Sequence, residues 1–109
     1  MSDLDVKIQD VTDFWKHKMP MMAMEELSEV IQAISKVERA RDVFREALED
    51  DVEVVDAARY QIDKRKDELK DEIRDIYISM RALMLYYGID ESDVMERVEE
   101  KLNKKYKED

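Results

Sequence analysis

The sequence contains no cysteine, only one glycine and only one proline among its 109 residues. The absence of cysteine excludes disulfides, thiolate metal sites and thiol nucleophiles. Because Gly and Pro are scarce and Glu, Lys, Arg, Leu, Met and Ala are abundant, almost nothing in the chain breaks a helix. We therefore expect a single all-α domain over residues 1–109, with a core of modest size.

Basic residues are also in deficit, with 19 Lys and Arg against 29 Asp and Glu and a formal net charge of −10. A field of this sign repels phosphodiester backbones, so we expect no nucleic acid as partner. No apolar run approaches the ~18 residues of a membrane span, and the first ten residues, MSDLDVKIQD, do not resemble a signal peptide. We expect a cytoplasmic protein that does not bind membranes.

Apolar residues at helical spacing predict four helices, over about 3–18, 20–48, 52–87 and 92–105. Pro20 suits the first turn of the second helix, and Gly88 suits the C-terminal cap of the third. For the third, two alternatives stay open: one long helix, or two helices with a bend near residue 65. The second and third together predict a helical bundle built on a long antiparallel hairpin.

Two acidic pairs stand out, because each has its members three residues apart: Glu26 with Glu29, and Glu72 with Asp75. At about 100° per residue, each pair flanks the apolar stripe of its helix on the same side. The stripes are Ala23, Leu27, Val30, Ile31 and Ile34 in one helix, and Leu69, Ile73, Ile76, Met80 and Leu83 in the other. If the helices pack antiparallel through these stripes, the two acidic flanks meet.

The register of the hairpin supports the same meeting point. With the turn between Asp50 and Asp51, Glu29 lies 21 residues before Asp50 and Glu72 lies 21 residues after Asp51. Both carboxylates are then roughly 32 Å from the turn, at 1.5 Å per residue. Crowded carboxylates need a proton or a divalent cation, and oxygen ligands favour Mg²⁺ or Mn²⁺. The alternative interpretation is an ordinary solvated acidic face.

The motifs E25-E26-L-S-E29 and E72-I-R-D75 resemble the EExxE…ExxD signature of the MazG-like all-α nucleoside triphosphate pyrophosphohydrolases. The similarity covers most of the chain from Met19 onward. One departure is the spacer of 42 residues between Glu29 and Glu72, since the family usually separates its two motifs by fewer residues.

The resemblance implies Mg²⁺-dependent hydrolysis of ribo- or deoxyribonucleoside triphosphates to the monophosphate and pyrophosphate, with a role in clearing non-standard or excess nucleotides. It implies four Mg²⁺ ligands and one further catalytic carboxylate: Glu26, Glu29, Glu72 and Asp75 as ligands, with Glu25 beside them. It also implies groups near the C-terminus that hold phosphate or sugar: Lys101, Asn103, Lys104 and Tyr106. Trp15 is a candidate for stacking on the base, with core packing as the alternative.

Two other functions stay open. One is a non-catalytic helical scaffold whose acidic groups are solvated and whose hairpin binds a partner helix. The other is a related all-α pyrophosphohydrolase that acts on dUTP, dCTP or phosphoribosyl-ATP. Because helices this long in a short chain leave apolar stripes for a second copy to cover, we expect a homodimer or homotetramer.

Overall fold

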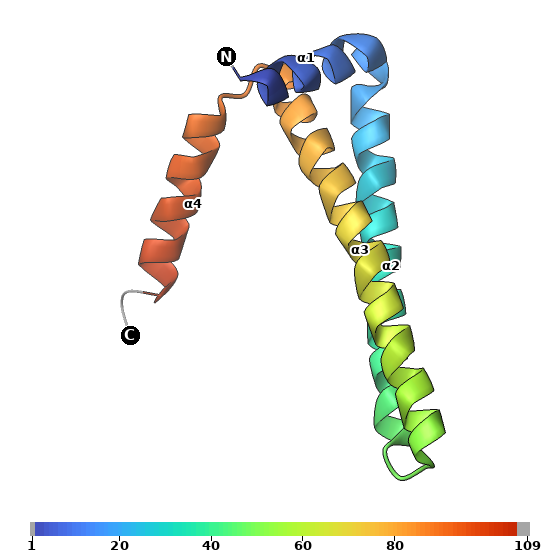
Figure 1. Ribbon diagram of the computed structural model, residues 1–109. Helices are drawn as coiled ribbons and strands as arrows, with labels where there is room; N and C mark the ends of the chain where they lie inside the picture. The colour runs from blue at the N-terminus through green and yellow to red at the C-terminus, as the bar shows by residue number, and fades with distance from the viewer. Residues whose placement is uncertain (1, 107–109) are drawn as a thin grey trace. The chain divides into compact units, whose positions relative to one another are not determined.

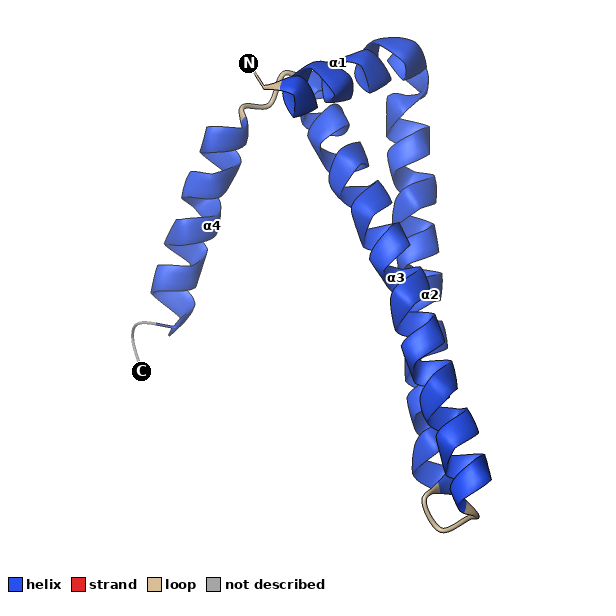
Figure 2. Ribbon diagram, in the orientation of Figure 1, coloured by secondary structure: helices blue, strands red, loops and turns tan. Residues whose placement is uncertain are grey.

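The computed structural model describes the backbone of residues 2–106 and the side chains of residues 2–104, and this part of the chain is helical apart from two short connections (Figures 1 and 2). The elements are α1 (Asp3–Trp15), the 3-10 helix η1 (Lys16–Lys18), α2 (Met19–Ala47), α3 (Val52–Tyr87) and α4 (Glu91–Tyr106). The all-α class is confirmed. No helix among these residues is both long and apolar enough to cross a membrane.

The helices form two compact units. The first comprises Met1–Pro20 and Ile78–Asp109, and the second comprises Met21–Tyr77. The long helix α3 therefore contributes to both units, with its first part in the second unit and its last part in the first.

The second unit is an antiparallel hairpin of α2 and α3 (Figure 1). Residues 48–51 connect the helices, and the Asp50 N–H donates to the Ala47 carbonyl at 2.9 Å. The Val55 N–H donates to the Asp51 carbonyl at 3.1 Å, which begins the hydrogen bonding of α3. Of the two alternatives for residues 52–87, the structure has the single unbroken helix, as expected where no Gly or Pro interrupts.

The helices of the hairpin meet along a narrow seam whose members recur at alternating intervals of three and four residues. This is the spacing of a left-handed coiled coil. In α2 the buried and half-buried seam positions are Ala23, Glu26, Val30, Ala33, Val37, Ala40, Phe44 and Ala47. In α3 they are Val55, Ala58, Ile62, Arg65, Leu69, Glu72 and Ile76.

The seam does not follow the apolar stripe predicted for α2, and this expectation was wrong. Leu27, Ile31 and Ile34 are exposed, with 67% of Ile31 accessible to solvent. The stripe is wider than one neighbouring helix can cover, and the small side chains of Ala23 and Ala33 allow closer approach than the bulky ones do. In α3 the predicted stripe is only partly buried. Leu69 and Ile76 lie in the seam, whereas Ile73 is exposed.

In the first unit, polar contacts hold the start of α1. The Asp5 N–H donates to Ser2 Oγ at 3.1 Å, and the Ser2 N–H donates to Asp5 Oδ2 at 3.1 Å, which is a capping box. Arg81 of α3 forms ion pairs with Asp5 and with Glu91 of α4. The hydrogen bonds from Ser2, followed by that from Arg81, lower the pKa of Asp5 to about 2. One guanidinium thus joins the starts of α1 and α4 to α3.

Helix α3 ends just before Gly88, which is the only glycine in the sequence. Gly88 has φ +67°, its N–H donates to the Leu85 carbonyl at 3.2 Å, and the Ile89 N–H donates to the Met84 carbonyl at 2.8 Å. These two bonds form a Schellman motif. The Asp90 carboxylate then accepts the Ser92 N–H at 3.0 Å, which satisfies one free donor at the start of α4.

Replacing Gly88 by Ala should reduce the free energy of unfolding by about 1 kcal/mol, because a side chain disfavours the positive φ. An added Cβ meets no atom within 4 Å, so backbone strain alone causes the loss. Urea unfolding followed by far-UV circular dichroism measures it. Gly88→Asn should cost less, since Asn tolerates this conformation. An equal loss in both variants would contradict this explanation.

Candidate metal site

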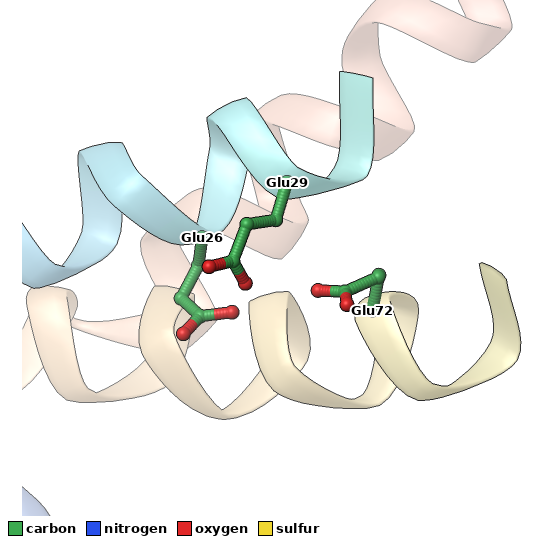
Figure 3. Close-up of side chains that lie close together, drawn as sticks. All are labelled: Glu26, Glu29 and Glu72. Atoms are coloured by element: carbon green, nitrogen blue, oxygen red, sulfur yellow. The ribbon is translucent and has the colours of Figure 1, made fainter. Parts of the chain in front are cut away.

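Three carboxylates from the two helices of the hairpin converge. Glu26 and Glu29 come from adjacent turns of α2, and Glu72 comes from α3 (Figure 3). One oxygen of each residue lies within 4.8 Å of the others. We call these three residues the glutamate triad. The two acidic motifs therefore lie at the same height along the hairpin, as counting residues from the turn predicted. Both belong to the second unit.

The triad owes its geometry to the coiled-coil seam. Glu26 and Glu72 occupy seam positions, so each is half-buried between the helices, whereas Glu29 lies on the flank and is exposed. Burial restricts the rotamers of the two seam carboxylates. The third remains accessible from solvent. The site is therefore open on one flank of the hairpin and backed by the seam.

Two carboxylates of the triad, those of Glu26 and Glu72, have raised pKa values. The pKa of Glu26 is raised, first by burial and then by the charges of Glu29, Asp75 and Glu72. The pKa of Glu72 is also raised, by burial and next by Glu29. Loss of solvation and like charge both favour the neutral acid. Glu26 and Glu72 therefore keep their protons to higher pH than an isolated glutamate does.

Two oxygens of the triad lack a hydrogen-bond partner among the described residues. They are Glu26 Oε2 and Glu72 Oε2, and both are inaccessible to solvent. A buried oxygen without a donor costs roughly 1–3 kcal/mol, more when it carries charge. Such atoms in a folded protein call for a ligand, a proton or an ordered water. In the described part of the chain, no donor lies within hydrogen-bonding distance of either oxygen.

Asp75, the fourth predicted ligand, is half-buried nearby. Its charge contributes to the raised pKa values of Glu26 and Glu72, yet it does not belong to the triad. Its Oδ1 accepts a hydrogen bond from Arg74 Nε at 3.0 Å. Because the Arg74 side chain is mostly exposed, this ion pair is a weak restraint on the carboxylate.

Of the remaining predicted site residues, Glu25 directly precedes Glu26 in the chain, and the others belong to the first unit. Glu25 is exposed on α2, in the second unit. Trp15 belongs to the first unit, where it is half-buried and packs edge-on against Phe14 with ring centroids 5.1 Å apart. Three of the C-terminal candidates are exposed on α4 of the first unit: Lys101, Asn103 and Lys104. The side chain of Tyr106 lies outside the described residues.

The structure also adds a charged pair that the sequence analysis did not identify. Arg65 is half-buried in the seam and donates to both carboxylate oxygens of Glu68, at 3.2 and 3.0 Å. The hydrogen bond from Arg65 is the largest cause of the lowered pKa of Glu68, and Lys64 and Lys36 contribute. Residues 63–72 are mostly charged, a composition typical of a solvated helix face. The seam positions in this run, Arg65, Leu69 and Glu72, recur at intervals of three and four residues, and this spacing distinguishes them from the exposed positions.

The chemistry of the triad suits a hard divalent cation. All donors are carboxylate oxygens, and no histidine or cysteine takes part. Opposite ligands of a six-coordinate Mg²⁺ ion lie about 4.2 Å apart, twice the usual Mg–O distance. Of three ligands only two can be opposite, and adjacent ligand oxygens lie about 3 Å apart. The three oxygens lie within 4.8 Å of one another, so they would draw closer around an ion, and the exposed Glu29 side chain has room to move. The residues present therefore fit Mg²⁺ or Mn²⁺.

Comparison with known proteins adds no relative: no family model, no curated protein and no solved structure matches the chain.

The raised pKa of Glu26 makes the stability of the metal-free protein depend on pH. The folded state binds this proton more tightly than the unfolded chain, so stability falls as pH rises above the ordinary value of 4.5 and through the folded pKa. Glu26→Gln removes the cost of burying an ionised carboxylate beside other carboxylates. At pH 7 with EDTA, it should raise the free energy of unfolding by roughly 1 kcal/mol.

Urea unfolding at pH 7 and at pH 4 checks this expectation, because below pH 4.5 the advantage of the variant should largely vanish. The matched control is Glu46→Gln, an exposed residue of the same helix, which should change stability at neither pH. A Glu26→Gln protein less stable than wild type at pH 7 would mean that the carboxylate is stabilising without a cation.

Proposed function

We propose that the chain is a Mg²⁺-dependent nucleoside triphosphate pyrophosphohydrolase of the MazG-like kind. The observation that carries the proposal is the glutamate triad with its two unpartnered buried oxygens. A solvated acidic face would leave its carboxylates in water. In this hairpin, Glu26 and Glu72 take seam positions that apolar residues would fill at lower cost.

The reaction breaks the bond between the α-phosphorus and the oxygen that bridges it to the β-phosphate. A bound Mg²⁺ ion supplies polarisation of the phosphoryl oxygens and lowers the pKa of water. Glu26 and Glu72 would hold the cation at the seam, and Glu29 would reach it from the open flank. The nearby Asp75 would add negative charge that favours the cation. Glu25, one turn from Glu29 and exposed, is placed to accept the proton of the attacking water. Pyrophosphate leaves with the bridging oxygen.

Lysines on the same flank as Glu29 are placed to contact the phosphates. Lys36 follows Glu29 by two helical turns, about 10 Å along α2, and so shares its flank. Lys64 lies on the corresponding flank of α3, and the charges of both lysines lower the pKa of Glu68. In a chain of net charge −10, such cations offset the repulsion of a triphosphate.

Substrate recognition beyond the phosphates remains part of the proposal. The candidates named from the sequence are Trp15 for the base and a C-terminal group for phosphate or sugar: Lys101, Asn103, Lys104 and Tyr106. They belong to the first unit, whereas the triad belongs to the second. The hairpin continues past the triad toward its turn, and this extension accounts for the long spacer between the two acidic motifs. Substrates such as dUTP, dCTP or phosphoribosyl-ATP belong to the same reaction class.

Pyrophosphate release from a panel of ribo- and deoxyribonucleoside triphosphates, with Mg²⁺ and with EDTA, tests the function. We expect release with Mg²⁺ only. Glu29→Gln and Asp75→Asn should each lower kcat/KM by a factor on the order of 100 or more, since both remove charge that holds the cation. Circular dichroism should show unchanged helix content, because neither residue is fully buried.

Glu46→Gln again serves as the control, with the same change of charge outside the triad. Absence of release from every nucleotide, phosphoribosyl-ATP included, together with no Mn²⁺ binding by electron paramagnetic resonance, would overturn the proposal in favour of the helical scaffold. Mn²⁺ binding that Glu29→Gln abolishes, without any release, would keep the metal site and reject the reaction.

Lys36→Ala should raise KM about tenfold while kcat changes less, because the lysine contacts bound phosphate rather than the reacting atoms. Steady-state kinetics on the preferred nucleotide measure both constants. Lys70→Ala removes an equal charge from the opposite flank of the hairpin and should leave KM unchanged. Equal effects of the two substitutions would show that only the overall charge matters.

A further inference from the structure

The hairpin carries a groove on the turn side of the glutamate triad, and all of its lining residues belong to the second unit. The volume of this groove is about 530 Å³, within the range of roughly 300–1,000 Å³ that is usual for small-molecule sites. Half-buried seam residues of both helices form its floor: Val37, Phe44, Ile62 and Leu69. Exposed cations form its rim: Arg41 and Arg45 of α2, and Lys66 of α3.

The charge of the rim is opposite to that of the whole chain. Acidic residues outnumber basic ones by 29 to 19, yet the groove is lined by three basic side chains and no acidic one. A further cation lies against the floor, because the guanidinium carbon of Arg59 stands 5.6 Å from the centre of the Phe44 ring. A cleft lined by charges of one sign raises the local concentration of ions of the opposite sign. The groove therefore favours an anion.

The ion pairs that the rim already makes compete only weakly with such an anion. Arg41 pairs with Glu38 at 3.3 Å and Arg45 pairs with Asp42 at 2.9 Å, and every one of these side chains is more than half exposed. Water and salt screen pairs of this kind. A guanidinium also has more N–H donors than one carboxylate accepts. Lys66 pairs with no carboxylate in the described part of the chain.

We propose that the groove binds a small amphiphilic anion, an organic molecule with an apolar body and a phosphate or carboxylate head. The apolar floor suits the body, and guanidinium groups match the geometry of either head. On α2 the lining extends from Val37 to Arg45, roughly 12 Å, which suits a small molecule better than a long partner helix. The inference is independent of the proposed function, because no residue of the triad lines the groove.

Nuclear magnetic resonance titration of the ¹⁵N-labelled full chain tests the site with four probes, each below its micelle concentration. Octyl phosphate and octanoate have both body and head, octyl glucoside has the body without charge, and inorganic phosphate has the head alone. EDTA keeps cations from the triad. At least one of the two complete probes should bind roughly tenfold more tightly than either partial probe, because only it uses floor and rim together. The largest shifts should fall on the amides of the lining residues.

Arg41→Gln tests the rim without endangering the fold, because Arg41 is exposed. It should weaken binding of the tighter complete probe about tenfold and leave octyl glucoside unaffected. The matched control is Arg39→Gln, which removes the same charge from an exposed position of the same helix outside the groove. In about 0.15 M salt, where the Debye length is about 8 Å, this control should bind the probe as wild type does.

Three outcomes would overturn the proposal. Equal affinity for octyl glucoside and for the charged amphiphiles would show that the groove is an apolar surface only. Equal losses in Arg41→Gln and Arg39→Gln would show that the probe responds to overall charge rather than to the rim. Shifts that are largest outside the lining residues would place the anion elsewhere on the chain.

Discussion

The register between α2 and α3 is the constraint on which the other features of the second unit depend. The four-residue connection after Ala47 sets it, and the alternating three-four seam maintains it over the length of the hairpin. Only in this register do Glu26 and Glu72 meet across the seam with Glu29 beside them. A slip by one turn would separate the two motifs by about 5 Å along the hairpin.

The composition of the seam shows a compromise between stability and the placement of charge. Alanines at four buried positions allow the helices to approach closely but contribute little apolar area. Glu26, Arg65 and Glu72 occupy further seam positions, where apolar residues would pack at lower cost. Arg65 is compensated by Glu68, whereas the two glutamates retain unpartnered oxygens. Departures from apolar patterning that remain uncompensated mark candidate functional sites.

The hairpin presents two flanks of opposite character. One carries the acidic groups and nearby lysines. The other carries exposed apolar side chains, among them Leu27, Ile31 and Ile73, together with balanced ion pairs nearer the turn.

Local signals in the sequence determined most of the secondary structure. The scarcity of Gly and Pro predicted helices, Pro20 and Gly88 marked the beginning of α2 and the end of α3, and the bounds of α3 were predicted as observed. Helix periodicity and turn position also predicted the level at which the two acidic motifs meet, because rise and angle per residue are nearly constant.

Only the tertiary structure decided which part of each wide apolar stripe is buried. Helical periodicity gives the direction of every side chain but not which direction the neighbouring helix covers. Close packing favoured the alanine side of α2, so Glu26 entered the seam and Ile31 remained exposed. The burial of two carboxylates and the exposure of large apolar side chains both follow from the choice of face, which depends on contacts between residues distant in the sequence.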